Sequence, residues 1–142
     1  MLKAAHDLAL ELANQAGAII RQNFHLQSTK SWKSDNSPVT ETDLAINSLV
    51  IEAVKNAFPN HAVIGEEESY GDPHATDWTW SCDPLDGTVP FSHGWPMFTF
   101  SLGLAHQGTS VLGVIYDPIL DRLWVGENDG GTTLNGTAVQ VN

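Results

Sequence analysis

The stretch WTWSCDPLDGT, residues 78–88, decides both the fold of this sequence and the place of its chemistry. Residues 78–82 are a short aromatic and apolar run, and such a run between polar segments predicts a buried β-strand. Asp83 and Asp86 follow directly and are separated by Pro-Leu, a pair that favours a turn. We therefore expect both carboxylates and the Leu85 carbonyl to point to one place beyond the end of the strand.

A second acidic cluster of the same kind lies upstream, at residues 65–68 (GEEE), after the apolar run AVI of residues 62–64. Because each cluster follows a predicted strand, their carboxylates are expected to converge at one edge of the sheet. Three or four carboxylates together without Lys or Arg repel one another, and a divalent cation neutralises such a set. Oxygen ligands without a nearby cysteine suit Mg²⁺, Mn²⁺ or Ca²⁺ rather than zinc.

Gly87 and Thr88 add the features of an anion site beside these acids. Glycine lets the backbone approach a ligand closely, and the threonine offers a hydroxyl next to two backbone N–H groups. A phosphate held by those groups at the start of a helix would complete a metal–phosphate site. An Asp-Gly-Thr turn alone is usually only a turn, and a glutamate run is usually a solvated loop. The combination of both, each after a strand, is the more specific signal.

Two helices are predicted before these motifs. Apolar residues recur at three- and four-residue steps from Leu2 to Phe24, which predicts an amphipathic helix of about six turns. Residues 27–39 are polar and contain a proline, which indicates an exposed loop. Residues 40–43 (TETD) carry the residue types of a helix N-cap, and the second helix should end near Phe58.

The rest of the chain predicts five or six strands joined by tight turns. Gln-Gly at residues 107–108 separates two strands, and Asn-Gly at residues 135–136 is a strong hairpin signal. Two helices followed by such strands indicate an α+β fold in which the helices pack on a mostly antiparallel sheet. Residues 1–142 read as a single domain or as the N-terminal part of one. A sheet this apolar is expected to carry a further helical layer on its other face, and the sequence supplies none.

Composition excludes several classes of function. The net charge is -11, and residues 56–142 hold eleven acidic residues against one basic residue, Arg122. A field of that sign repels phosphate backbones and anionic lipid, so we expect no nucleic-acid or membrane partner. The single cysteine, Cys82, excludes a disulfide framework and is expected to be buried rather than catalytic. With no signal peptide and no spanning segment, a cytoplasmic protein is the default expectation.

The motifs GEE at residues 65–67 and DPLDGT at residues 83–88 together resemble the signature of the inositol monophosphatase superfamily. Four further stretches agree with it: residues 33–43, 98–105, 113–117 and 134–136. The resemblance runs over nearly the whole chain but corresponds to the first half or so of a typical member. It implies the first half of a layered αβαβα sugar-phosphatase fold, with the C-terminal half absent.

The resemblance also implies a Mg²⁺-dependent phosphomonoesterase, usually inhibited by Li⁺, that acts on a small sugar or polyol phosphate such as inositol monophosphate. Two or three Mg²⁺ ions are expected, with Mn²⁺ as a substitute. Glu66, Asp83 and the Leu85 carbonyl would hold the metal that activates water. Asp83 and Asp86 would hold a second metal beside the leaving-group oxygen, as two-metal chemistry requires.

The same resemblance assigns the remaining roles. Asp43 and Thr88 would form a hydrogen-bonded pair that orients and deprotonates the attacking water, so that Asp43, Thr88 and the metal ligand Glu66 are the candidate catalytic residues. Asp86 and the N–H groups of Gly87 and Thr88 would contact the substrate phosphate. A homodimer is an option, because dimers are common among relatives.

Departures from the family pattern leave alternatives open. Val89-Pro90 replaces the small polar residue and asparagine that usually follow this motif, which leaves open a difference in phosphate affinity or substrate choice. The family's W-D-x-x-A-G segment, with its last metal-binding aspartate, has no counterpart, and neither Asp117 nor Asp121 matches it. A truncated, non-catalytic homologue that binds divalent cations or a partner chain is therefore the alternative function. Inositol phosphate, fructose bisphosphate, histidinol phosphate and nucleotide phosphates all remain open as substrates.

Overall fold

The computed structural model of the chain describes residues 1–24, 30–32 and 38–142. Two long helices, α1 (Leu2–Asn23) and α2 (Glu41–Ala57), come before most of the strands, and a short helix, α3 (Thr88–Ser92), lies between two of them. The strands are β1 (Lys30–Trp32), β2 (Pro38–Thr40), β3 (Ala62–Gly65), β4 (Trp78–Asp86), β5 (Thr99–His106), β6 (Thr109–Asp117), β7 (Arg122–Glu127), β8 (Gly131–Leu134) and β9 (Thr137–Val139).

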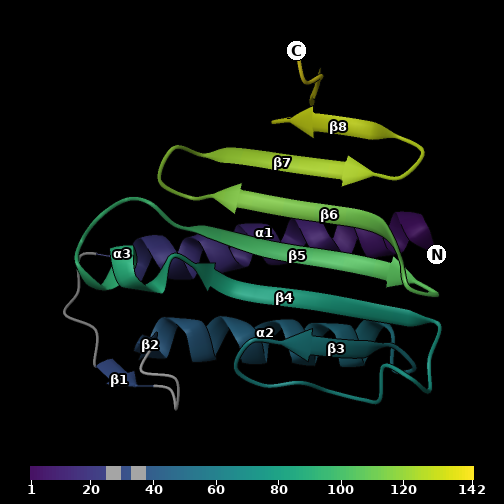
Figure 1. Cartoon of the computed structure of the whole chain (residues 1–142), viewed down its shortest axis with the longest axis horizontal. Coiled ribbons are helices and arrows are strands. Elements are labelled where there is room, and N and C mark those ends of the chain that lie inside the picture. The colour runs from purple at the N-terminus through teal and green to yellow at the C-terminus, as the bar shows by residue number, and fades with distance from the viewer. Residues whose placement is uncertain (25–29, 33–37) are drawn as a thin grey trace.

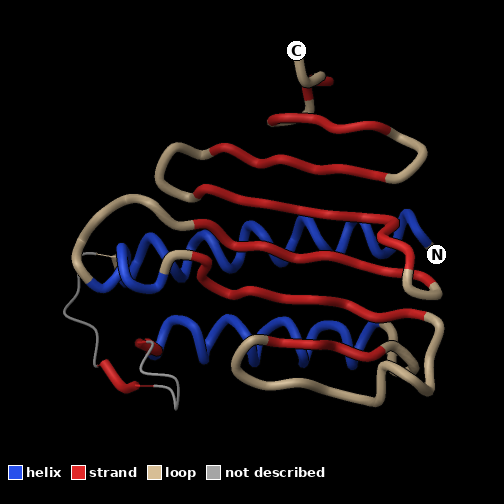
Figure 2. Tube along the Cα trace, viewed as in Figure 1, coloured by secondary structure: helices blue, strands red, loops and turns tan. Residues whose placement is uncertain are grey.

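Within the described residues, seven strands form one sheet in the order β3-β4-β5-β6-β7-β8-β9. β3 and β4 pair in parallel, and each later pair of neighbours is antiparallel. Both α1 and α2 lie on one face of this sheet, behind it in Figures 1 and 2. Their apolar faces and the sheet enclose a core that includes Trp80 and Phe100. The predicted fold, two N-terminal helices packed on a mostly antiparallel sheet, is confirmed.

The opposite face of the sheet is open. In the views of Figures 1 and 2, no described helix or strand lies over it. On this face Ile64 and Ile115 are exposed to solvent, by 48% and 46% of their surface. A hollow of about 480 Å³ runs between them, over Gly103 and Gly113. The expected second helical layer would lie here, and it stays a prediction.

Two local predictions were wrong. Residues 27–39 were expected to form a loop, but β1 and β2 within this segment pair as a small antiparallel sheet; residues 27–29 and 33–37 lie outside the described residues. The turn expected at Pro84 is instead a continuation of β4, in which Asp83 pairs with Ser101, Asp86 pairs with Thr99, and the register shifts between them. A proline is tolerated inside a strand at such a bulge because it need not donate a ladder hydrogen bond there.

The turns predicted at residues 107–108 and 135–136 are confirmed. Asn135 and Gly136 both have left-handed backbone angles, φ 48° and 80°, as do Gln107 and Gly108 at 50° and 78°. Two successive residues of this kind match the right-handed twist of the strands on either side, which is why Asn-Gly favours them. Among the described residues, no helix combines the length and the apolar character that a membrane span requires.

A stack of rings closes the end of the sheet remote from the acidic motifs. His61 is buried, and its Nδ1 accepts a hydrogen bond of 3.0 Å from Trp80 Nε1. Its ring stacks on Phe58 at 4.7 Å between centroids and on Trp78 at 5.7 Å, and Trp78 stacks in turn on His106 at 4.1 Å. Burial lowers the pKa of His61 below its ordinary value. The folded state therefore favours the neutral imidazole.

Lowering the pH from 7 to 5 should destabilise the fold through His61. Because its folded pKa lies below its unfolded value of about 6.5, its contribution is complete above that pH and is lost as the pH falls below it. We expect a loss of about 1 kcal/mol, the net worth of the hydrogen bond that a protonated Nδ1 cannot accept. Urea unfolding at both pH values measures the loss. His61→Phe keeps a ring in the stack but cannot titrate, so an equal pH effect in this variant would contradict the assignment to His61.

Candidate active site

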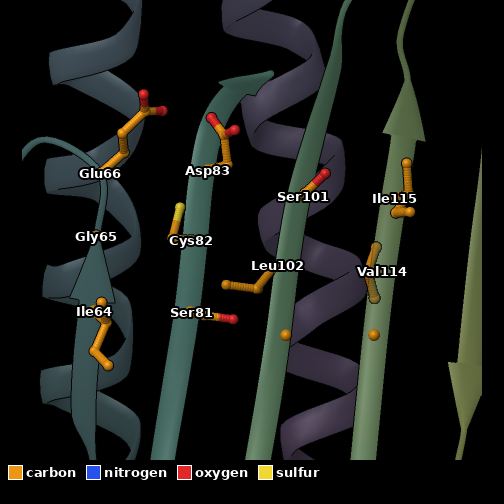
Figure 3. Close-up of a pocket in the computed structure, with 12 residues that line it drawn as sticks. Ile64, Gly65, Glu66, Ser81, Cys82, Asp83, Ser101, Leu102, Val114 and Ile115 are labelled. Atoms are coloured by element: carbon orange, nitrogen blue, oxygen red, sulfur yellow. The ribbon is translucent and has the colours of Figure 1, made fainter. Parts of the chain in front are cut away.

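The acidic motifs meet at one edge of the sheet. β3 and β4 are parallel, and their ladder ends at the pair Gly65 and Cys82, so the next residues, Glu66 and Asp83, lie side by side, as Figure 3 shows. The first turn of α2, with Asp43, and the start of α3, with Thr88, meet at the same edge through a hydrogen bond between these two residues. The convergence expected of two acidic clusters after neighbouring strands is thus present.

Asp43 is completely buried, and its two carboxylate oxygens have different partners. Thr40 is the N-cap of α2, and Oδ2 of Asp43 accepts hydrogen bonds from the Thr40 backbone N–H at 2.8 Å and from its hydroxyl at 2.6 Å. The Asp43 N–H bonds back to the Thr40 hydroxyl oxygen, which completes a capping box. Oδ1 points the other way and accepts from the Thr88 hydroxyl at 3.3 Å. Asp43, a member of the capping box, thus also contacts Thr88 at the start of α3.

The Thr88 hydroxyl has two acceptors for its one proton. Besides Asp43 Oδ1, the Leu85 carbonyl oxygen lies 3.1 Å away. A hydroxyl donates to one acceptor at a time, so these two bonds compete. If a cation drew the Leu85 carbonyl to itself, the Thr88 proton would be left to Asp43 alone. The arrangement is therefore compatible with Leu85 as a carbonyl ligand and Thr88 as the partner of Asp43.

Glu66 and Asp83 form a pair of interacting acids. Burial, then the hydrogen bond and like charge of Glu66, then the like charge of Asp86, raise the pKa of Asp83 to about 7. A weak opposing bond comes from the Leu85 N–H, 3.3 Å from Asp83 Oδ1. Both charged neighbours that act on this carboxyl are acids, so the negative charges of Glu66 and Asp83 repel each other. A proton shared near neutral pH relieves this repulsion, and a bound cation would relieve it in the same way.

These residues fit a divalent cation by their chemistry, although the side chains are not yet arranged around one. Among the described residues, no group of three or more His, Cys, Asp or Glu side chains is in position to hold a metal ion. Glu66 and Asp83 are brought together, and Asp86 is near enough to act on Asp83 through its charge. The all-oxygen donor set and the mutual repulsion of its members favour Mg²⁺, Mn²⁺ or Ca²⁺ over zinc.

The turn into α3 shows what the Val89-Pro90 departure does. Gly87 is the N-cap with φ 105°, and a Cβ there would collide with the Met97 carbonyl oxygen, so only glycine fits. Pro90 has no N–H, and the Phe91 N–H bonds to the Gly87 carbonyl at 3.0 Å. An anion at this turn would therefore find the N–H groups of Gly87 and Thr88 and at most one more, from Val89.

Other candidates have structural roles. Burial, followed by the charges of Asp83 and Glu66, raises the pKa of the Cys82 thiol to about 12, which leaves the thiol unreactive. Asp117 accepts hydrogen bonds from two backbone N–H groups of the following turn and pairs with Arg122 at 3.0 Å. Asp121 accepts from the Tyr116 hydroxyl. Neither of these two aspartates joins the acidic site.

Sequence reasoning missed one residue, Asn47. It is buried on α2, where it bonds to the backbone of the loop that follows β3. The available signal was its spacing, because a polar residue four positions after Asp43 lies on the same helix face.

These features define a layered α+β protein with a carboxylate site where two parallel strands end beside a capped helix. The chain belongs to the inositol monophosphatase family, which it matches over residues 2–142. The resemblance inferred from GEE and DPLDGT is thereby confirmed.

Similar proteins cover this chain almost completely. It is 43% identical over 137 residues to inositol monophosphatase 1 of Solanum lycopersicum, and the matched region covers 94% of this chain and 50% of that protein. It is 37% identical over 135 residues to a histidinol-phosphatase of Chlorobaculum parvum, with coverage of 94% and 52%. The fold superposes on the crystal structure of extragenic suppressor protein suhB from Bartonella henselae with a TM-score of 0.91 at 29% identity, over 98% of this chain and 55% of that one. The chain thus spans about half the length of the relatives it matches.

Proposed function

We propose that this protein contributes the metal-binding half of a Mg²⁺-dependent phosphomonoesterase that acts on a small sugar or polyol phosphate. The observation that carries the proposal is the meeting of two pairs at one sheet edge, Glu66 with Asp83 and Asp43 with Thr88. Family membership supports the reaction class. The relatives' names include both an inositol monophosphatase and a histidinol-phosphatase, so the leaving group stays open between a polyol and an amino alcohol.

Each residue has one task in this proposal. Glu66, Asp83 and the Leu85 carbonyl would bind one cation, and Asp83 with Asp86 a second. Cations held there would lower the pKa of a bound water and stabilise charge on the leaving oxygen.

The other residues handle the proton and the phosphate. A water that donates to the Thr88 oxygen would pass its proton along the existing hydrogen bond to Oδ1 of Asp43. The N–H groups of Gly87 and Thr88 would hold the phosphate oxygens in line with that water.

Phosphate release by the purified chain tests the proposal. With Mg²⁺ we expect turnover of inositol monophosphate or histidinol phosphate, loss of turnover after chelation, and inhibition by Li⁺. Fructose bisphosphate and a nucleotide monophosphate complete the substrate panel. Absence of Mg²⁺-dependent release across the panel would refute catalysis by this chain.

A second candidate function rests on the open sheet face. The uncovered isoleucines and the half-length match favour a chain that binds cations or a partner without turnover. In this version, a partner chain would cover the hollow over Gly103 and Gly113 on the open face. Calorimetric titration with Mg²⁺ beside the release assay separates the candidates, because binding without turnover supports the second and turnover by this chain alone excludes it.

Thr88→Val should lower turnover by about 10²-fold and leave Mg²⁺ affinity nearly unchanged. The valine keeps the shape of the side chain but removes the hydroxyl that links Asp43 to the water, and one positioned proton-transfer group contributes about this factor. Steady-state kinetics with a Mg²⁺ titration makes the measurement. Thr88→Ser keeps the hydroxyl and serves as the control, so an equal loss in both variants would assign the effect to packing of the methyl group.

A further inference from the structure

Asn47 connects the helix that carries Asp43 to the loop that carries Glu66. Only 1% of Asn47 is exposed. Its Nδ2 donates to the Glu68 carbonyl oxygen at 2.9 Å, and its Oδ1 accepts from the Glu67 N–H at 3.3 Å. One amide side chain thus pairs with two backbone groups of the loop, as a neighbouring strand would in a sheet.

The loop closes tightly around this amide. A Cβ at Gly65 would collide with Asn47 Oδ1 and with the Glu68 carbonyl oxygen, so the glycine is needed for the close approach. On the other side, the Glu66 N–H donates to the Cys82 carbonyl of β4 at 3.2 Å. The backbone of residues 66–68 is therefore held between α2 and β4, and the Glu66 carboxylate lies beside Asp83 in Figure 3.

We propose that Asn47 is the positioning residue of the acidic site, fixing Glu66 relative to Asp43 through the Glu66–Glu68 loop. This inference rests on the proposed function, since it concerns the metal that Glu66 would help to hold. The Asn47 side chain bonds to the backbone of the loop at Glu67 and Glu68. It acts through the backbone, and residues that orient a metal ligand typically change metal affinity 10–100-fold when they are replaced.

An amide side chain satisfies both hydrogen bonds at position 47, whereas an aspartate or a leucine, which are of similar size, would not. The loop presents one N–H and one C=O to α2, and an amide has an acceptor oxygen and a donor nitrogen to match them. An aspartate would place a charge against the Glu68 carbonyl with nothing to donate. A leucine of similar size would fill the space and leave both loop groups to turn towards water, which the partly exposed loop permits.

Asn47→Leu tests the role because it keeps the packing of α2 and removes both hydrogen bonds. We expect the Glu67 amide to lose its protection from hydrogen exchange and the affinity for Mn²⁺ to fall 10–100-fold. Asn47→Ala is the second variant, and it gives the same readouts if leucine disturbs the helix. The matched control is Val54→Ala, which is also buried on α2 but about two turns further along the helix than Asn47. It should lower the thermal midpoint and change Mn²⁺ affinity by less than twofold.

Two results would overturn the inference: full protection of the Glu67 amide in both Asn47 variants, or Mn²⁺ affinity no weaker in them than in Val54→Ala. The exchange experiment decides without metal, so it remains valid if the wild-type chain binds no Mn²⁺. A wild-type chain that binds no Mn²⁺ would count against the proposed function but not against the role of Asn47 in the loop.

Discussion

Replacing Asp83 with asparagine should lower Mg²⁺-dependent phosphate release by about 10³-fold, which corresponds to about 4 kcal/mol of lost transition-state stabilisation. Asp83 is the acid that pairs with Glu66 and also feels the charge of Asp86, so it stands between the two proposed cations. Asparagine keeps the shape and one oxygen but removes the charge. The loss should appear in turnover and in Mg²⁺ affinity together, measured by phosphate release and by calorimetry.

The same substitution should have the opposite effect on the stability of the metal-free chain. The folded pKa of Asp83, about 7, lies above its ordinary value of 3.8, so its contribution favours the fold at low pH and is lost as the pH rises through about 7. At pH 8 the ionised pair therefore costs stability, about 1–2 kcal/mol after allowing for solvent screening of this half-exposed group. Asp83→Asn removes that cost, so urea unfolding without Mg²⁺ should show a more stable variant.

The control for both measurements is Asp129→Asn, in the exposed turn between β7 and β8. It removes the same unit of charge from a chain with net charge -11, without touching the carboxylate pair. Equal effects from the two substitutions would mean that general repulsion, rather than the pair at the sheet edge, is responsible. A variant Asp83→Asn with unchanged Mg²⁺ affinity would remove Asp83 from the proposed site.

Local patterns predicted most of this fold because the interactions that form it are local. The three- and four-residue spacing of apolar side chains gave α1, the residues Thr40 to Asp43 gave the start of α2, and Asn135-Gly136 gave the last hairpin. The convergence of the acidic clusters was expected because each follows a predicted strand, and the parallel pairing of β3 with β4 produces it. Its separation into metal, water and phosphate roles came from the resemblance to a family and stays a prediction.

The predictions that failed depend on pairing partners that the local residue pattern does not mark. The continuation of β4 past Pro84 requires β5 beside it to accept a bulge, and the pairing of β1 with β2 requires two short segments to meet. Asn47 was missed for the same reason, since the Glu67 N–H that it binds is 20 residues away in the sequence. Periodicity marks a polar residue on a helix face but does not say which loop will return to it.

Asp43→Ala should be the most damaging single change to fold and function at once. It removes the capping box of α2 and leaves Thr40 without its buried acceptor, which should cost about 2–3 kcal/mol in urea unfolding. It also removes the carboxylate to which Thr88 would pass a proton in the proposed reaction, and the loss of such a base typically lowers turnover by about 10²–10⁴-fold. Both losses are expected because the two oxygens of one carboxylate serve the two purposes.

Thr40→Ala separates the two purposes. It removes the capping hydroxyl and should cost about 1 kcal/mol, while the Thr40 backbone N–H still holds Oδ2 and leaves Oδ1 directed at Thr88. Turnover should therefore stay within several-fold of the wild type, although the helix is weakened. If Thr40→Ala instead lost as much turnover as Asp43→Ala, the carboxylate would act as a helix cap alone, and the requirement for Asp43 would be one of folding. Retained turnover with a weakened cap would place the catalytic requirement on Oδ1, the oxygen that the capping box leaves free to face Thr88.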